Sequence, residues 1–145
     1  MKKKMLKNQK GISLLVLMIT IVILAILAGM AVTHIDTGKD IKEYNYMCAD
    51  IELLESKIMT YYNKYNDIPI TGTVFNAKST LGDQASSRDN DNYYQINIGD
   101  IYNITLNYGG GTRENEDIYI INEQSHEVYY LKGVKLEGVR YYTKK

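Results

Sequence analysis

The stretch KNQKGISLLVLMITIVILAILAGMAVTHI, residues 7–35, sets the architecture expected for the whole chain. None of the 21 residues from Ile12 to Val32 is charged, and only Ser13 and Thr20 carry polar side chains. A helix needs roughly 20 apolar residues to cross the hydrocarbon core of a bilayer. The sequence therefore predicts a transmembrane helix over residues 12–34.

The charges around this helix predict its orientation. Basic residues near a membrane span favour the cytoplasmic side. The residues before Gly11 include five lysines and no acidic residue, and the lysines are Lys2, Lys3, Lys4, Lys7 and Lys10. We therefore expect a single-pass protein of the cell membrane, with its amino terminus in the cytoplasm and residues 67–145 outside the cell. Taking these five from the 17 basic residues leaves 12 against 17 acidic ones, so the remainder carries −5. That balance argues against a nucleic-acid partner.

A cleaved secretory signal is the first alternative, because Gly29 and Ala31 are small residues at the spacing that signal peptidase prefers. The apolar run is longer than the roughly 7–15 residues typical of such signals. A plain uncleaved anchor is the second alternative.

The residues at the cytoplasmic edge favour a third interpretation. A lysine-rich leader ends at Gly11, and the apolar run begins at the next residue, Ile12. In this arrangement the chain resembles the type IV pilin and pseudopilin superfamily over residues 1–34. The resemblance implies that residues 1–11 are a leader, that prepilin peptidase cleaves after Gly11, and that Ile12 is then N-methylated. A glycine suits such a site because it lets the backbone approach the protease closely.

The chain departs from the usual family pattern at the fifth mature position. Counting Ile12 as the first residue places Val16 where most members have glutamate. In the family that carboxylate is thought to neutralise the amino terminus of a neighbouring subunit within the apolar filament core. The junction is similar to a Gram-positive, clostridia-related variant that reads Gly-Ile-Ser-Leu and lacks the glutamate.

An amphipathic pattern continues beyond the membrane. Apolar residues recur at steps of three and four, which predicts that residues 35–66 extend the helix. The expected buried stripe is Ile41, Tyr44, Cys48, Ile51, Leu54 (or Leu53), Ile58, Tyr61 and Tyr65. The helix should run from Ile12 to Tyr65 and end before Pro69, the only proline.

Residues 67–145 are predicted to form a small antiparallel sheet. Candidate strands are 71–75, 92–98 and 103–109, followed by a hairpin of Asp117–Asn122 and Glu127–Leu131 and a second hairpin that turns at Glu137-Gly138. The fold class is therefore α+β, a long amino-terminal helix packed against a small antiparallel sheet, as in pilins.

The resemblance implies a structural role in a type IV pilus or type II secretion-like filament at the cell surface. Its partners would be copies of itself, other pilin-like subunits and prepilin peptidase, with an assembly ATPase and a membrane platform protein acting indirectly. Packing in the filament core is expected at Ser13, Val16, Thr20, Ala25, Ala28 and Gly29.

No catalytic residues are predicted. The two histidines, His34 and His126, stand in no recognisable motif, and Cys48 has no adjacent base. Asp89 and Asp91 are weak candidates for calcium, because the spacing of a full calcium loop is missing. We therefore expect no enzyme activity, no cofactor and no firm metal site.

Two further hypotheses stay open. The chain could be a membrane-anchored extracellular binding module that never polymerises, which the absence of the glutamate favours. It could also be a DNA-uptake pilin, which predicts salt-sensitive DNA binding and conflicts with the acidic balance.

Overall fold

A computed structural model describes the backbone of residues 2–85 and 91–145, and the side chains of residues 13–28, 38–85 and 91–145. By its internal contacts the chain divides into two compact units, Met1–Lys39 and Asp40–Lys145. The described strands all belong to the second unit. The chain is thus α+β with an antiparallel sheet, as expected.

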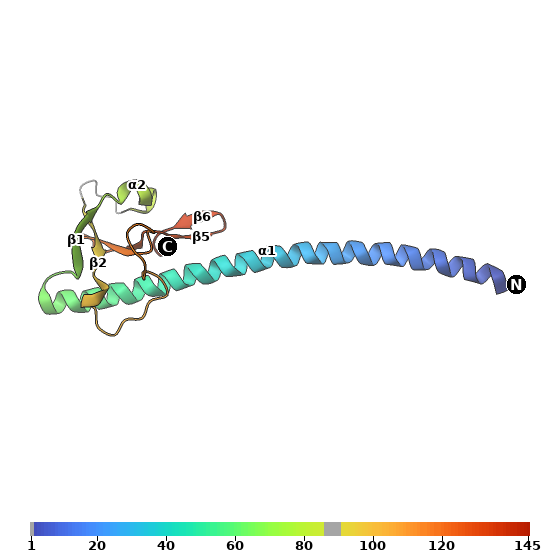
Figure 1. Ribbon diagram of the computed structural model, residues 1–145, viewed down its shortest axis with the longest axis horizontal. Coiled ribbons are helices and arrows are strands. Elements are labelled where there is room, and N and C mark those ends of the chain that lie inside the picture. Colours follow the sequence, from blue (N-terminus) through green and yellow to red (C-terminus); the bar gives the residue numbers. More distant parts are fainter. Residues whose placement is uncertain (1, 86–90) are drawn as a thin grey trace. The chain divides into compact units, whose positions relative to one another are not determined.

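Helix α1, Lys2–Tyr65, starts earlier than the predicted Ile12 and ends where predicted (Figure 1). The next residue, Asn66, has a left-handed φ of 53°, and its N–H donates to the carbonyl of Tyr62 at 2.7 Å. A left-handed residue after the last turn is a common way to end a helix, and asparagine tolerates it. The predicted end before Pro69 is confirmed.

The second unit contains a four-stranded antiparallel sheet in the order β1-β2-β3-β4. Its strands are β1 Ile70–Phe75, β2 Tyr93–Ile96, β3 Tyr119–Asn122 and β4 Val128–Tyr130. The short helices between them are α2 Lys78–Leu81, η1 Gly82–Gln84 and η2 Ile98–Asp100. The predicted β3–β4 hairpin is confirmed, with slightly shorter strands.

A separate two-stranded hairpin joins β5, Val134–Leu136, to β6, Val139–Tyr141. Its two turn residues, Glu137 and Gly138, have φ values of 51° and 82°. Positive φ at both central positions characterises a type I′ turn, whose twist matches that of the strands. The predicted turn at Glu137-Gly138 is therefore confirmed.

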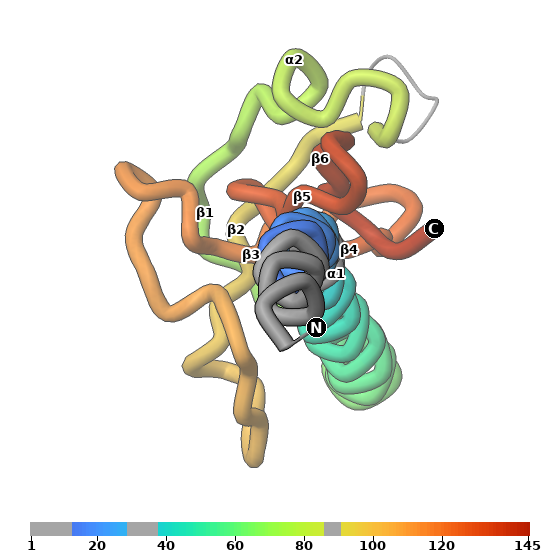
Figure 2. Tube along the Cα trace, turned by 90° about the vertical axis from the view of Figure 1, so that its right-hand side faces the viewer, coloured from blue at the N-terminus to red at the C-terminus, as the bar shows by residue number. Residues whose placement is uncertain are grey.

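The sheet packs on both faces. The part of α1 in the second unit covers one face, and α2 lies on the other (Figures 1 and 2). The α1 side buries Met47, Ile51, Leu54, Ile58, Tyr119, Ile121, Val128 and Tyr130, among others. The α2 side buries Phe75, Leu81, Tyr93, Ile118, Ile120, Tyr129 and Leu131. Successive residues of β3 thus point to opposite faces, as strand geometry requires.

The predicted helix stripe is right at its centre and wrong at its ends. Ile51 and Leu54 are fully buried, whereas Ile41 and Tyr65 are 45% and 51% exposed. Met47 is fully buried, while the predicted Cys48 is only half-buried. The sheet is shorter than the helix, so only the turns that face it have partners for an apolar stripe.

The predicted strand at residues 103–109 is wrong, because these residues form no strand. They belong to the long connection between η2 and β3, which loops to one side of the sheet and is drawn in orange tones in Figure 2. The N–H groups of Asn107 and Tyr108 donate to the carboxylate of Asp50 on α1. A side chain therefore takes the place of a neighbouring strand as hydrogen-bond acceptor.

Candidate assembly surface and its supporting network

The predicted cleavage junction, Gly11 and Ile12, lies outside the residues with described side chains. The same is true of Gly29 and His34. Of the residues expected to pack in a filament core, Ser13, Val16, Thr20, Ala25 and Ala28 are described, and all are exposed.

The first candidate surface is the segment of α1 from residue 13 to residue 28. Every side chain in it is exposed, and its large hydrophobic residues have exposed fractions from 49% at Ile23 to 65% at Leu24. The hydroxyl of Thr20 donates to the carbonyl of Leu17 at 2.8 Å, so it is satisfied within the helix. A helix that is apolar all round requires a surrounding apolar environment.

Among the residues with described side chains, no helix is both long enough and apolar enough to cross a membrane. Residue 12 and residues 29–34 of the predicted span lie outside them.

The second unit is organised around a buried carboxylate, Asp50, which is 2% exposed. It accepts hydrogen bonds from the N–H groups of Asn107 and Tyr108 at 2.9–3.0 Å. It also accepts from the side-chain amide of Asn107 at 2.9 Å and from the hydroxyl of Tyr119 at 2.7 Å. A buried charge is tolerated when hydrogen bonds replace its hydration. Asp50 thus joins α1 to the connection between η2 and β3, and to β3 itself.

A second carboxylate, Asp117, closes the same connection. Its Oδ1 accepts from the N–H of Gly109 at 2.8 Å and from the hydroxyl of Tyr130 at 2.7 Å. The ring of Tyr130 stacks on Tyr108, with centroids 5.2 Å apart, and contacts Tyr119 at 5.1 Å. The two carboxylates therefore hold a cluster of three tyrosine rings between α1 and the sheet.

Burial and the hydrogen bond to Asp50 raise the pKa of Tyr119 far above its ordinary value. Burial and the hydrogen bond to Asp117 likewise raise the pKa of Tyr130. Both causes favour the neutral hydroxyl, because it donates to a carboxylate in a poorly hydrated site. These tyrosines act as fixed donors, which suits a structural role.

Sequence reasoning missed this network. One signal was present: Asp50 lies between Met47 and Leu54, three and four residues away, and so interrupts the apolar face of the helix. An acidic residue at a buried helical position indicates a hydrogen-bonded partner elsewhere in the chain. The identity of that partner, the connection between η2 and β3, is not visible in the sequence.

The two aspartates considered as calcium ligands are not seen together in the structure. Asp89 lies outside the described residues, and the carboxylate of Asp91 accepts from the amide of Asn122 at 2.9 Å. The described part of the chain brings together no group of three potential metal ligands.

His126 lies in the connection between β3 and β4, with its ring 5.0 Å from that of Tyr62. Burial raises the pKa of the Cys48 thiol, which makes it less reactive.

Among the hollows on the described surface of the second unit, two differ clearly in their lining. The first, of about 200 Å³, lies between the end of α1 and the η2 region, and we name it the tyrosine groove. Its walls include Lys57, Tyr61, Lys64, Tyr65, Asp100 and Tyr102. The second, of about 540 Å³, has acidic residues of α1 on one wall and basic residues of the β5–β6 hairpin on the other. Its charged lining is Asp40, Glu43, Asp117, Lys132, Lys135 and Arg140.

Comparison of the chain with protein-family models, with curated proteins and with solved structures finds no match.

Proposed function

We propose that this chain is a structural subunit of a type IV pilus or type II secretion-like filament, a pilin or pseudopilin that is cleaved after Gly11. The observation that carries the proposal is the exposed apolar segment of residues 13–28, together with the lysine-rich leader and the glycine that precede it. Such a segment needs an apolar environment on all sides. A lipid bilayer supplies it before assembly, and the helices of neighbouring copies supply it afterwards.

Transfer from lipid to filament keeps the segment away from water throughout. Because lipid chains are as apolar as leucine, the gain comes from close packing of helices rather than from the hydrophobic effect. Small side chains at Ser13, Ala25 and Ala28 allow close approach between helices. The energy for extrusion would come from the cytoplasmic assembly ATPase, acting through the platform protein.

The second unit supports the same proposal through its packing. The buried Asp50 fastens α1 to a connection more than fifty residues away in the sequence. A subunit pulled by its helix needs a domain that stays attached to that helix. Hydrogen bonds to a buried charge are among the stronger ones in proteins, so Asp50 suits this purpose.

The alternative is a membrane-anchored extracellular binding module that does not polymerise. It is favoured by Val16, which is 50% exposed and offers no carboxylate to neutralise a neighbour's amino terminus. Under this alternative Gly11 has no special role.

The deciding experiment is to determine the amino-terminal residue and mass of the chain in native membranes and in sheared surface filaments. We expect a mature chain that starts at methylated Ile12. The variant Gly11→Leu should keep its leader and disappear from the filaments. Gly38→Leu is the matched control, because an added side chain at Gly38 meets nothing within 4 Å. Recovery of an intact leader in cells with active prepilin peptidase, or no difference between the two variants, would favour the anchored module.

A further inference from the structure

We infer that copies of this chain join head to tail through their second units, with the tip of the β5–β6 hairpin of one copy seated in the tyrosine groove of the next. This inference rests on the proposed function and names the surface through which neighbouring external domains meet. It is carried by two exposed surfaces at opposite ends of the unit and by the charges around them.

The tyrosine groove lies at the far end of α1. Tyr61 and Tyr65 stack at 4.6 Å on the helix, and Tyr102 faces them from the segment after η2. Tyr65 is 51% exposed and Tyr102 is 79% exposed, so the aromatic walls are open to solvent. Exposed aromatic groups gathered around a concavity are typical of an interaction site.

Charges border this groove in a fixed arrangement. Lys57 and Lys64 line it from the helix, and the ammonium of Lys64 lies 4.9 Å from the ring centroid of Tyr65. Asp100 lines the opposite wall, where the side-chain amide of Asn97 donates to its carboxylate at 2.9 Å. A matching surface therefore needs an apolar knob with an acidic residue beside it.

The tip of the β5–β6 hairpin has these features. Val139 is 52% exposed beside the turn, and Glu137 is an exposed turn residue. Arg140, the residue after Val139, lies on the other face of the hairpin, where its guanidinium donates to the carbonyl of Lys132 at 2.6 Å. In the interface Val139 enters the groove and Glu137 meets its lysines.

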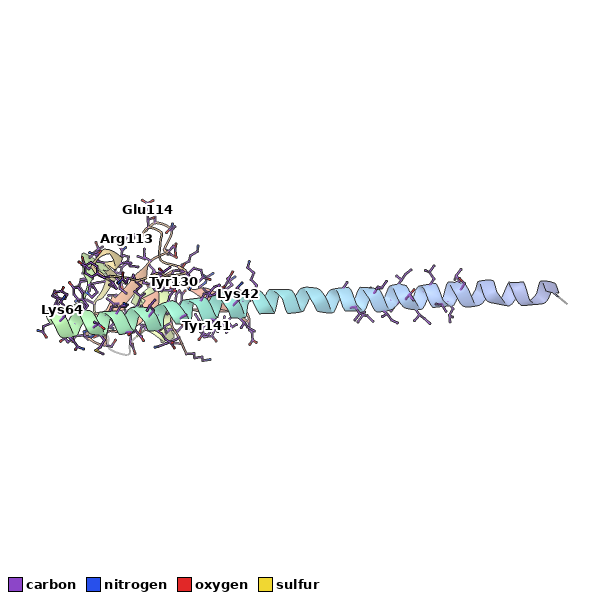
Figure 3. All side chains as sticks on the ribbon, turned by 90° about the horizontal axis from the view of Figure 1, so that it is seen from below. Lys42, Lys64, Arg113, Glu114, Tyr130 and Tyr141 are labelled. Atoms are coloured by element: carbon purple, nitrogen blue, oxygen red, sulfur yellow. The ribbon has the colours of Figure 1, made fainter. Side chains whose placement is uncertain are left out.

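The hairpin tip and the groove lie at opposite ends of the second unit. The ring of Tyr141, at the end of β6, lies 5.4 Å from that of Tyr44, whereas the groove contains Tyr61. Seventeen residues of helix separate Tyr44 from Tyr61, which corresponds to about 25 Å. Figure 3 shows the same separation, with Lys64 at one end of the unit and Tyr141 towards the other.

A contact between two different patches at opposite ends cannot close a symmetric dimer. Such a heterologous contact produces an open, helical array of copies when its rotation does not close a ring. That is the symmetry that a filament requires. A second copy of this chain is therefore the occupant that the arrangement of the two patches favours.

The test is site-directed cross-linking of the full chain in sheared native filaments. Cys48→Ser removes the native thiol, and Tyr102→Cys with Val139→Cys places one thiol on each patch. A short bis-maleimide should then link many copies into a ladder, whereas each single-cysteine variant should give no more than dimers. Both positions are exposed, so the substitutions leave the core intact. The matched control pairs Val139→Cys with Val74→Cys, because Val74 is 51% exposed and lies outside the groove.

The outcomes separate the two proposals. If the Cys48→Ser chain is absent from filaments that contain the unaltered chain, the serine substitution has disrupted assembly, and Cys48→Ala takes its place in the test. If the unaltered chain is absent from filaments, both proposals fail. If it is present but the groove pair gives no longer products than the control pair, only this inference fails. A cross-link to a different protein, identified by mass, would also overturn it.

Independent support would come from Glu137→Lys, which should abolish the ladder, and from Lys64→Glu in the same chain, which should restore it.

Discussion

Replacing Asp50 tests whether one buried carboxylate holds the second unit together. Its carboxylate accepts from two backbone N–H groups, one amide and the hydroxyl of Tyr119. A hydrogen bond to a charged group contributes about 1.5–3 kcal/mol, and a buried donor left without a partner costs about 1–3 kcal/mol. Tyr119 is 1% exposed, whereas water can reach Asn107. We therefore expect Asp50→Ala to lower the free energy of unfolding by about 4 kcal/mol and Asp50→Asn by about 2 kcal/mol. A loss of about 4 kcal/mol is a large part of the roughly 5–15 kcal/mol that stabilises a typical domain.

The assay is urea unfolding of the full chain in detergent micelles, followed by near-ultraviolet circular dichroism. All 14 tyrosines lie between residues 44 and 142, so this signal reports on the second unit. Glu52→Gln is the matched control on the same helix, because Glu52 is exposed and should change stability by no more than about 0.5 kcal/mol. A double-mutant cycle of Asp50→Asn with Tyr119→Phe should give a coupling of about 1 kcal/mol or more. If Asp50→Asn costs no more than the control, the network does not hold the connection on the helix.

Three other properties can be predicted. The pKa values of Tyr119 and Tyr130 are raised in the folded chain, so these two hydroxyls release protons on unfolding above about pH 10. Their contribution to stability should be constant below that pH and fall above it by up to about 1.4 kcal/mol per pH unit for each tyrosine. Urea unfolding between pH 8 and 11 measures this slope, and Tyr119→Phe should flatten it; an unchanged slope would argue against the assignment. Gly109→Ala should lower the free energy of unfolding by more than about 1 kcal/mol, since the φ of Gly109 is 85° and an added Cβ would lie 2.6 Å from the ring of Tyr119. Gly110→Ala is the control, because an added Cβ there meets nothing within 4 Å, and it should leave the melting temperature nearly unchanged. Asn66→Ala should cost about 1 kcal/mol at the left-handed helix end and Asn66→Gly almost nothing; equal melting temperatures for the two variants would contradict this reason.

Local patterns in the sequence were sufficient for much of the fold. The end of α1 follows from Pro69, whose ring excludes helical geometry just before it. Both hairpins, β3–β4 and β5–β6, follow from alternating apolar residues. The turn of the β5–β6 hairpin also follows from Gly138, which permits a positive φ. The apolar character of residues 13–28 is likewise a property of sequence alone, as is the junction at Gly11, which remains a prediction.

Contacts between distant residues decided the rest. Residues 103–109 alternate like a strand, but the N–H groups of Asn107 and Tyr108 donate to Asp50, more than fifty residues earlier, because a buried carboxylate must recover the hydrogen bonds it loses with water. The tyrosine groove likewise combines helix residues with Asp100 and Tyr102, which no spacing rule brings together. The sequence by itself determined the end of the helix, the two hairpins and the apolar surface of residues 13–28, since these depend on neighbours within a few residues. Only the tertiary structure decided which polar groups meet, because that depends on how separate segments pack.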